Sequence, residues 1–468
     1  MRVALVLCPQ WDLRFAPLAP ALLTAALKER GHEAEFFDLN QEMTLLARAA
    51  GDPDFEQAPT FESRWSDPAF VHERVLPGYR ESLEAAAARL LAGGTRVVGF
   101  SVFFSNRVLS LELAAMLKRR EPGVRVVFGG PSCVRLEEAA SCLRTGFVDA
   151  VFLGEADRSF PDFVDALART GKPEGALGVL LAGESARWAP GGESVADLDA
   201  LPFADFSGHR LGRYDGRTIH LSRGCINRCA FCVTGRGEGY RCRSGARVAE
   251  ELEGLLAGGG GATFFFCDSI LNGSLRELEA FRAGVRGRRL EPLWGGYAAA
   301  RREMTPELLS GLREAGCRFL LYGVESGSAK VLREMGKPAA PELNARVLRD
   351  TAAAGIQSVV TLMVGFPSET EEDFGETLSF VRANARSIGM LAPSLFAVDE
   401  LVDRGGDWGL VPGGDFVRWS TRDGRNAFET RVSRLERLFA AAAACGVRID
   451  FEARVGAAGM QSLFERGL

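Results

Sequence analysis

No stretch of the sequence approaches the ~18 consecutive apolar residues of a membrane-spanning helix. The longest candidate, residues 438–447, is rich in alanine and much too short. The apolar run within residues 1–8 is too short for the h-region of a signal peptide, and Leu7 stands where a small residue should precede a cleavage site. We therefore expect a cytoplasmic protein with reduced thiols and no membrane partner.

The sequence also lacks an excess of positive charge. Its 468 residues include 56 Lys and Arg against 61 Asp and Glu, a formal net charge of -5. This balance removes the bulk electrostatic attraction that non-specific DNA or RNA binding needs, so nucleic acid is not an expected partner. Ten cysteines are too few for a secreted disulfide scaffold. Their spacing is therefore more informative than their number.

Short apolar runs alternate with segments of helical periodicity along most of the chain, which predicts an α/β fold. We expect a doubly wound Rossmann-like domain over residues 1–172 and a linker over residues 173–216, with a hairpin near Pro190. A partial (β/α)6 barrel should span residues 217–399, and a small, mainly helical region that closes the active site should span residues 400–468. The six expected barrel strands are residues 218–221, 262–267, 293–299, 319–324, 358–364 and 394–398.

Three thiols follow the first barrel strand with the spacing C-x3-C-x2-C: Cys225, Cys229 and Cys232. A cubane iron–sulfur cluster in a ferredoxin takes four cysteine ligands, so three thiolates in one loop leave one iron open to a substrate or cofactor. A structural zinc site is the alternative, and so is a set of unrelated buried cysteines. Zinc needs four ligands, and the sequence has no second C-x2-C pair and no His-x3-His, although Cys242 lies nearby.

This spacing, the preceding Ser222-Arg223-Gly224, and the aromatic Phe231 before the last cysteine resemble the radical S-adenosylmethionine (SAM) superfamily. The resemblance covers residues 217–398. It implies a [4Fe-4S] cluster on the three cysteines and SAM bound to the open iron. It also implies reductive cleavage of SAM to methionine and a 5'-deoxyadenosyl radical. Such a cofactor supplies the difficult chemistry, and the barrel supplies orientation and the exclusion of water.

Further site residues are implied at the carboxyl ends of the barrel strands, where such barrels hold their active sites. Asp268 stands where the family often has Gly-Gly-Glu, and it is expected to accept the amino group of SAM. Arg301 is expected to pair with the SAM carboxylate. Glu325 and Ser326 lie in a Gly-x-Glu-Ser-Gly segment, which implies contacts with the ribose or the amino group. Gly365, in Gly365-Phe366-Pro367, resembles the turn on the adenine side.

Glycines also end the predicted parallel strands of the N-terminal domain, where they let a large ligand approach the backbone. Their order resembles the cobalamin-binding domain that precedes the barrel in one subfamily of radical SAM enzymes. The cobalamin-binding residues that this resemblance implies are Ser101, Val102, Gly129, Gly130, Pro131, Gly154 and Glu155. The Asp-x-His-x-x-Gly motif that supplies a lower axial histidine is absent, so we expect no histidine ligand to cobalamin. The alternative is a Rossmann-like scaffold that binds no cofactor.

These resemblances imply a cobalamin-dependent radical SAM enzyme, a C-methyltransferase that acts on an unactivated carbon of a small-molecule or peptide substrate. Methylcobalamin would donate the methyl group, and a flavodoxin or ferredoxin would supply electrons. One alternative is cyclisation or rearrangement without methyl transfer. A methylthiotransferase is a second alternative, but it would need another cysteine triad in the N-terminal domain. A non-catalytic protein that binds a cluster or cobalamin is a third, although a passive cluster has no use for an open iron. The sequence does not identify the substrate.

Overall fold

The computed structural model describes residues 1–55, 64–173, 178–182, 194–232, 234, 239–398, 408–413 and 417–449. The chain forms two compact units: Met1–Ala58 with Glu62–Arg217, and Pro59–Phe61 with Thr218–Leu468. The units therefore divide one residue beyond the predicted start of the barrel. The predicted linker belongs to the first unit. The hairpin expected near Pro190 lies outside the described residues, as does the start of the predicted C-terminal region.

The first unit contains a six-stranded sheet with the order β3-β1-β4-β5-β6-β7. All neighbouring strands are parallel except β6 and β7. The strands are β1 (Arg2–Leu7), β3 (Glu33–Asp38), β4 (Val97–Ser101), β5 (Arg125–Gly129), β6 (Ala150–Phe152) and β7 (Val179–Leu181). The chain order reverses direction between β1 and β4, so the carboxyl ends of these strands form the ligand-binding edge expected of an open α/β sheet.

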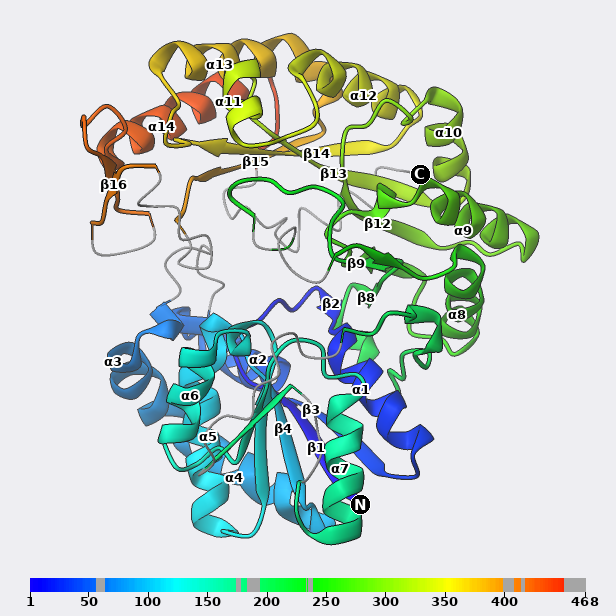
Figure 1. Cartoon of the computed structure of the whole chain (residues 1–468), viewed down its shortest axis with the longest axis vertical. Coiled ribbons are helices and arrows are strands. Elements are labelled where there is room, and N and C mark those ends of the chain that lie inside the picture. Colours follow the sequence, from blue (N-terminus) through cyan, green and yellow to red (C-terminus); the bar gives the residue numbers. More distant parts are fainter. Residues whose placement is uncertain are drawn as a thin grey trace. The chain divides into compact units, whose positions relative to one another are not determined.

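Helices cover both faces of this sheet, with α1 and α7 on one side and α4 and α6 on the other (Figure 1). They are α1 (Leu18–Glu29), α2 (Leu39–Ala50), α3 (Pro68–Phe70), α4 (Leu76–Leu91), α5 (Arg107–Arg120), α6 (Leu136–Arg144) and α7 (Ser159–Thr170). Alternate residues of β1 enter separate cores because side chains in a strand alternate between faces. Leu5 packs in the core that contains Phe163 of α7, and Val6 packs in the core that contains Met43 of α2. The prediction of a doubly wound α/β domain is confirmed.

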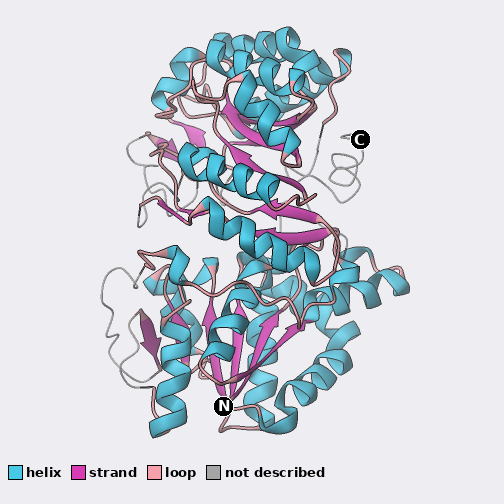
Figure 2. Cartoon of the chain, turned by 90° about the vertical axis from the view of Figure 1, so that its right-hand side faces the viewer, coloured by secondary structure: helices cyan, strands magenta, loops and turns pink. Residues whose placement is uncertain are grey.

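The second unit is a partial barrel of parallel strands in the order β15-β14-β13-β12-β11-β8. Helices follow the strands and line the outer face of this curved sheet (Figures 1 and 2). The strands are β8 (Gly216–Ile219), β11 (Thr263–Phe266), β12 (Leu293–Ala298), β13 (Cys317–Glu325), β14 (Gln357–Val364) and β15 (Met390–Leu395). In the first unit, β2 (Phe15–Ala16) pairs in parallel with Gly216 and Arg217 at the start of β8.

The helices of the barrel are α8 (Gly245–Ala257), α9 (Leu275–Gly287), α10 (Pro306–Glu314), α11 (Ala329–Glu334), α12 (Pro341–Ala353) and α13 (Glu371–Asn384). Among them, α9, α10 and α13 begin at side-chain caps. Thr305 caps α10 ahead of Pro306, and Thr370 forms a capping box with Asp373 at the start of α13. All of these helices except α11 pack their apolar faces on one core, in which Trp294 and Phe264 are fully buried.

The C-terminal region adds a short hairpin and one long helix to the barrel. The hairpin consists of β16 (Leu410–Val411) and β17 (Ser420–Thr421), and the helix is α14 (Phe428–Ala444). Leu438 and Ala442 of α14 are buried in the barrel core. In the part of the chain that the structure describes, no helix has both the length and the apolar character needed to cross a membrane.

Candidate active site

The three predicted ligand cysteines lie between Arg223 and Arg241, in a segment here called the cysteine loop, of which the structure describes residues 224–232, 234, 239 and 240. A two-residue antiparallel pair closes its base, in which β9 (Ser222–Arg223) meets β10 (Arg241–Cys242). Gly224 has φ 78°, and a Cβ atom there would lie 2.2 Å from the carbonyl oxygen of Gly239. Only glycine therefore fits this side of the base. Cys242 lies on β10, in the base and not among the three spaced thiols.

The thiols of the cysteine loop are partly withdrawn from solvent. Cys229 is buried, and Cys225 and Cys232 are half-buried. Burial raises the pKa of the Cys225 and Cys229 thiols, and the positive charge of Lys337 acts in the opposite direction on both. Within the described residues, no three His, Cys, Asp or Glu side chains converge tightly enough to form a closed metal site. Three thiols on one loop beside a lysine nevertheless fit an iron–sulfur cluster as a donor set.

A segment that follows α11 supports the back of the cysteine loop. The backbone N–H of Ala230 donates to the carbonyl of Met335 at 2.8 Å. Gly336 has φ 69°, and its Cβ position lies 3.9 Å from the Cα atom of Cys229. Lys337 follows at once, and its Nζ lies 3.5 Å from Oε1 of Glu325. Lys337 is not among the predicted site residues, and its only signal in the sequence is its place directly after Gly336, which ends a helix beyond the Glu325 segment.

Glu325 is the last residue of β13 and has φ 66°, a backbone conformation that non-glycine residues rarely adopt. Its carboxylate is half-buried between Lys337 and the hydroxyl of Thr361, which donates to Oε2 at 3.3 Å. Unusual backbone conformations of this kind are found most often at functional sites. The predicted neighbour Ser326 is fully buried instead, and its hydroxyl lies 3.2 Å from that of Thr377 on α13.

Asp268 follows β11 and is 2% exposed. Its carboxylate accepts hydrogen bonds from the backbone N–H groups of Leu221 and Ser222 and from the Ser222 hydroxyl, the last at 2.6 Å. Burial raises the pKa of Asp268 to about 6, while these hydrogen bonds act in the opposite direction. The carboxylate therefore holds the chain where it enters the cysteine loop. A bond to a ligand would require one of these partners to be displaced.

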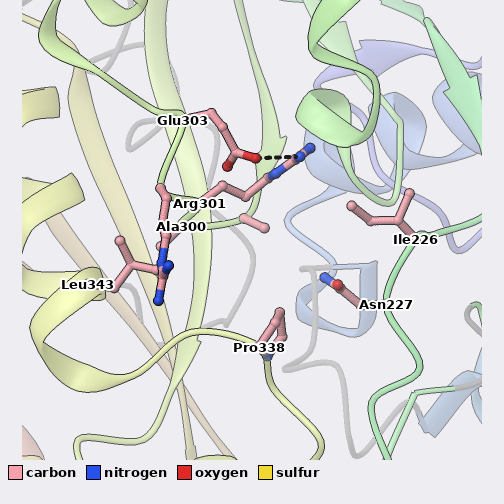
Figure 3. A pocket seen from close by; sticks show the side chains of 9 residues that line it. Ile226, Asn227, Ala300, Arg301, Glu303, Pro338 and Leu343 are labelled. Carbon is pink, nitrogen blue, oxygen red and sulfur yellow. Dashed lines mark hydrogen bonds and ion pairs between the residues drawn. The ribbon is translucent and has the colours of Figure 1, made fainter.

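Arg301 lies after β12 and borders a pocket of about 250 Å³ beside the cysteine loop. Figure 3 shows Ile226, Asn227, Pro338 and Leu343 around it. The Arg301 guanidinium donates to the carbonyls of Asn272 and Gly273 at 2.5 and 3.0 Å, and it pairs with Glu303 at 3.3 Å. These bonds fix the guanidinium at the border of the pocket.

Phe231 and the turn over residues 365–367 meet in one aromatic cluster. The cluster comprises Phe366, Phe396 and Trp419 with apolar residues of α11, and Phe231 is partly buried against it. The cysteine loop and the predicted adenine-side turn therefore share a packing surface. Gly365 itself has φ 87°.

The predicted cobalamin-side residues also come together, at the carboxyl edge of the first sheet. Ser101 pairs with Gly129 across β4 and β5, and the N–H of Val102 donates to the Gly129 carbonyl at 2.7 Å. Gly130 has φ 109°, and a Cβ atom there would lie 2.8 Å from the Val102 carbonyl. The Val102 backbone thus packs directly against Gly130, which leaves no room for a side chain there, while Ser101, Gly129 and Gly130 are half-buried at the edge of the sheet.

The other two predicted residues of this edge follow β6. Gly154 has φ 84°, and the carboxylate of Glu155 accepts a hydrogen bond from the N–H of Val195 at 2.9 Å. The three histidines of this unit contact residues other than those predicted to bind cobalamin. His32 pairs with Asp165, His72 pairs with Glu112, and His209 stacks on Phe36.

Comparison with known proteins identifies the barrel. Residues 219–381 match the family model of the radical SAM superfamily. The second unit carries a radical SAM domain. The predicted resemblance to the radical SAM superfamily is confirmed for the barrel. The cysteine loop lies inside the matched residues.

Two curated relatives of this chain show how far the similarity extends. An uncharacterised methyltransferase of Pyrococcus horikoshii is 27% identical over 296 residues, which cover 61% of this chain and 64% of the relative. The ribosomal protein uS12 methylthiotransferase RimO of Desulforudis audaxviator is 32% identical over 177 residues, or 35% of this chain and 39% of that one. The matches thus span less than two thirds of these relatives.

Among solved structures, the chain resembles the radical SAM methyltransferase TsrM of Kitasatospora setae. One structure of that enzyme holds cobalamin and a [4Fe-4S] cluster, and it matches with a TM-score of 0.61 and 21% identity. The match covers 84% of this chain and 74% of TsrM. Another holds its tryptophan substrate and a SAM analogue. This likeness confirms the predicted fold class.

Proposed function

We propose that this protein is a cobalamin-dependent radical SAM methyltransferase that acts on an unactivated carbon of a small-molecule or peptide substrate. The observation that carries the proposal is the three-thiol cysteine loop, which leaves a cluster one open position and lies in a radical SAM domain. Support also comes from the glycine-lined edge of the first unit and from the fold shared with TsrM over 84% of the chain.

The bound groups would supply electron transfer to SAM, a substrate radical and a carrier for the methyl group. The residues of the chain itself would bind these groups and orient them. Cys225, Cys229 and Cys232 would hold the cluster, with Lys337 as a neighbouring positive charge. Glu325 and Arg301 offer a carboxylate and a guanidinium to the amino acid end of SAM.

Ser101, Val102 and the residues from Gly129 to Pro131, together with Gly154 and Glu155, would hold cobalamin at the carboxyl edge of the first sheet. The two groups are expected to act together because a short-lived carbon radical is useful only when its methyl donor is already in position. Electrons would come from an external donor of the flavodoxin or ferredoxin type.

A methylthiotransferase remains the second candidate, because RimO is among the relatives. The burial of the cysteine thiols in the first unit argues against this candidate. Cys8, Cys133 and Cys142 of the first unit are buried, and burial raises the pKa of all three. Buried neutral thiols on separate elements are poor ligands for a second cluster.

The test is anaerobic reconstitution with iron, sulfide and cobalamin, followed by mass spectrometry of the products from methyl-labelled SAM. With its substrate, a methyltransferase of this type should form one 5'-deoxyadenosine and one S-adenosylhomocysteine per methylated product. Formation of 5'-deoxyadenosine without S-adenosylhomocysteine or a methylated product would favour cyclisation or rearrangement instead. Transfer of sulfur with the label would favour the methylthiotransferase.

A further inference from the structure

Two arginines of α14 are buried against the turn at residues 365–367, here called the Gly365 turn. Arg431 is 0% exposed and Arg434 is 3% exposed. Both lie in the C-terminal region, far along the chain from the motifs that mark the site. Burying a guanidinium costs free energy unless it is fully paired, so two such residues at one turn call for a reason.

Arg431 occupies the space in which a side chain at position 365 would lie. A Cβ atom on Gly365 would be 2.1 Å from Cδ of Arg431. The Arg431 guanidinium stacks over the ring of Trp419 at 3.5 Å and donates to the carbonyls of Val417 and Trp419 at 2.5 and 2.7 Å. The aliphatic part of Arg431 thus packs against the turn, while its Nη2 donates to the segment before α14.

Arg434 reaches the same turn through a carboxylate. Its Nη1 lies 3.3 Å from both the carbonyl oxygen and Oε2 of Glu369, and Oε2 accepts the N–H of Gly365 at 2.8 Å. Burial raises the pKa of Glu369 to about 7, and the Arg434 charge opposes that shift. Asn426, just before α14, donates to the carbonyl of Phe366 at 2.8 Å. Two backbone groups of the turn, the N–H of Gly365 and the carbonyl of Phe366, are therefore hydrogen-bonded to Glu369 and Asn426.

The network also connects to the cysteine loop. Phe366 packs on Phe396 at 5.4 Å between ring centroids, and Trp419 packs on Phe396 at 5.6 Å. Phe231, the residue before Cys232, contacts the same aromatic cluster. A substitution in α14 that moves the Gly365 turn would therefore also disturb the aromatic cluster against which Phe231 of the cysteine loop packs.

From these contacts we infer that Arg431, Arg434 and Asn426 of the C-terminal region are positioning residues, which hold the Gly365 turn in the conformation that receives the adenine of SAM. The inference rests on the proposed function, because it takes SAM as the ligand. A buried ion pair is weak evidence for a gain in stability, and its best-supported role is to select one arrangement of the chain. None of the three residues needs to touch the ligand.

The experiment compares Arg434→Met with Arg437→Met in the full chain carrying a reconstituted cluster. Arg437 lies on the same helix, is half-exposed, and pairs with Glu371 at the surface, so it is a matched control. Equilibrium binding is measured for SAM and, separately, for L-methionine, which has no adenine. Iron content and the melting temperature are measured on each variant.

Arg434→Met should weaken SAM binding about tenfold, the effect of about one lost charged hydrogen bond. L-methionine binding and iron content should stay within about twofold of wild type. Arg434→Lys should recover part of the SAM affinity because it keeps the charge at Glu369. Arg437→Met should bind both ligands as wild type does.

Unchanged SAM affinity in Arg434→Met would overturn the inference, and so would an equal loss of SAM and L-methionine affinity. If Arg434→Met does not fold, Asn426→Ala makes the same comparison, because it removes the bond to the Phe366 carbonyl and the bond that Oδ1 of Asn426 accepts from Arg434 at 3.4 Å, while the Arg434–Glu369 pair is kept. A wild-type protein that binds no cluster or no SAM would instead contradict the proposed function.

Discussion

The substitution Asp268→Asn separates two roles for a carboxylate that the sequence marks as a ligand for SAM. Three hydrogen-bond donors at the entry to the cysteine loop point at Asp268: the N–H groups of Leu221 and Ser222, and the Ser222 hydroxyl. With a pKa of about 6, the group is ionised at pH 7.5 and only accepts hydrogen bonds. Asparagine has the same shape, but it replaces one acceptor oxygen with a donor.

The expected loss of stability in Asp268→Asn depends on which hydrogen bonds to position 268 are kept. Oδ1 serves Ser222, whereas the N–H of Leu221 lies 3.1 Å from both oxygens. An asparagine that keeps its oxygen at the Oδ1 position therefore preserves the Ser222 bonds in weaker form and places an NH₂ group against the Leu221 N–H. A hydrogen bond to a charged group contributes about 1.5–3 kcal/mol, so we expect a loss of about 2 kcal/mol. In a unit of this size, that corresponds to a melting temperature lower by roughly 4–8 °C.

The assay measures thermal unfolding of the cluster-free protein, then iron content and SAM affinity after reconstitution. Asp350→Asn is the control, because Asp350 forms a half-exposed i,i+4 pair with Arg346 on α12 and should change the melting temperature little. If Asp268 supports the loop, melting temperature and iron content fall together. A variant with unchanged melting temperature and iron content but at least tenfold weaker SAM binding would refute this reasoning and establish Asp268 as a direct ligand.

Three further predictions concern the bound groups. Replacing Cys225, Cys229 and Cys232 together with alanine should abolish cluster binding, and about four irons per chain in the variant would contradict the assignment. Lys337→Met should lower the reduction potential of the reconstituted cluster in an EPR-monitored titration, because it removes a positive charge beside two ligands. Lys330→Met, at the Asp373 ion pair, should leave the potential unchanged. Bound cob(II)alamin should show no histidine nitrogen coupling in its EPR spectrum, and such coupling would contradict the prediction of an absent axial histidine.

The order of elements could be predicted because it depends on patterns within single segments. Each of the six barrel strands was expected within a few residues of its observed position. The sixth was expected at residues 394–398 and is observed at Met390–Leu395. Pro393 lies inside it, and proline argues against a central strand. It is tolerated because β15 is the edge strand of the sheet.

Partners of buried charges could not be predicted in the same way, because they come from distant parts of the chain. Nothing near Glu369 in sequence indicates that Arg434 lies against it, 65 residues later. Likewise, the sequence marks Asp268 and Arg301 as charged groups at strand ends. It does not reveal that backbone groups of neighbouring loops already occupy them.

Three carboxylates at the strand ends differ in how firmly they are held, and the difference bears on which one can meet a ligand. Asp268 and Glu369 are nearly fully buried, and each accepts a backbone N–H. Removing either from its partners would leave buried donors unsatisfied, at about 1–3 kcal/mol each. Glu325 has no such bond among its described contacts: its partners are the long Lys337 contact at 3.5 Å and a hydroxyl at 3.3 Å. Exchanging these long contacts for the ammonium group of an amino acid would break no bond to a backbone N–H, so we expect Glu325, rather than Asp268 or Glu369, to be the carboxylate that binds a ligand.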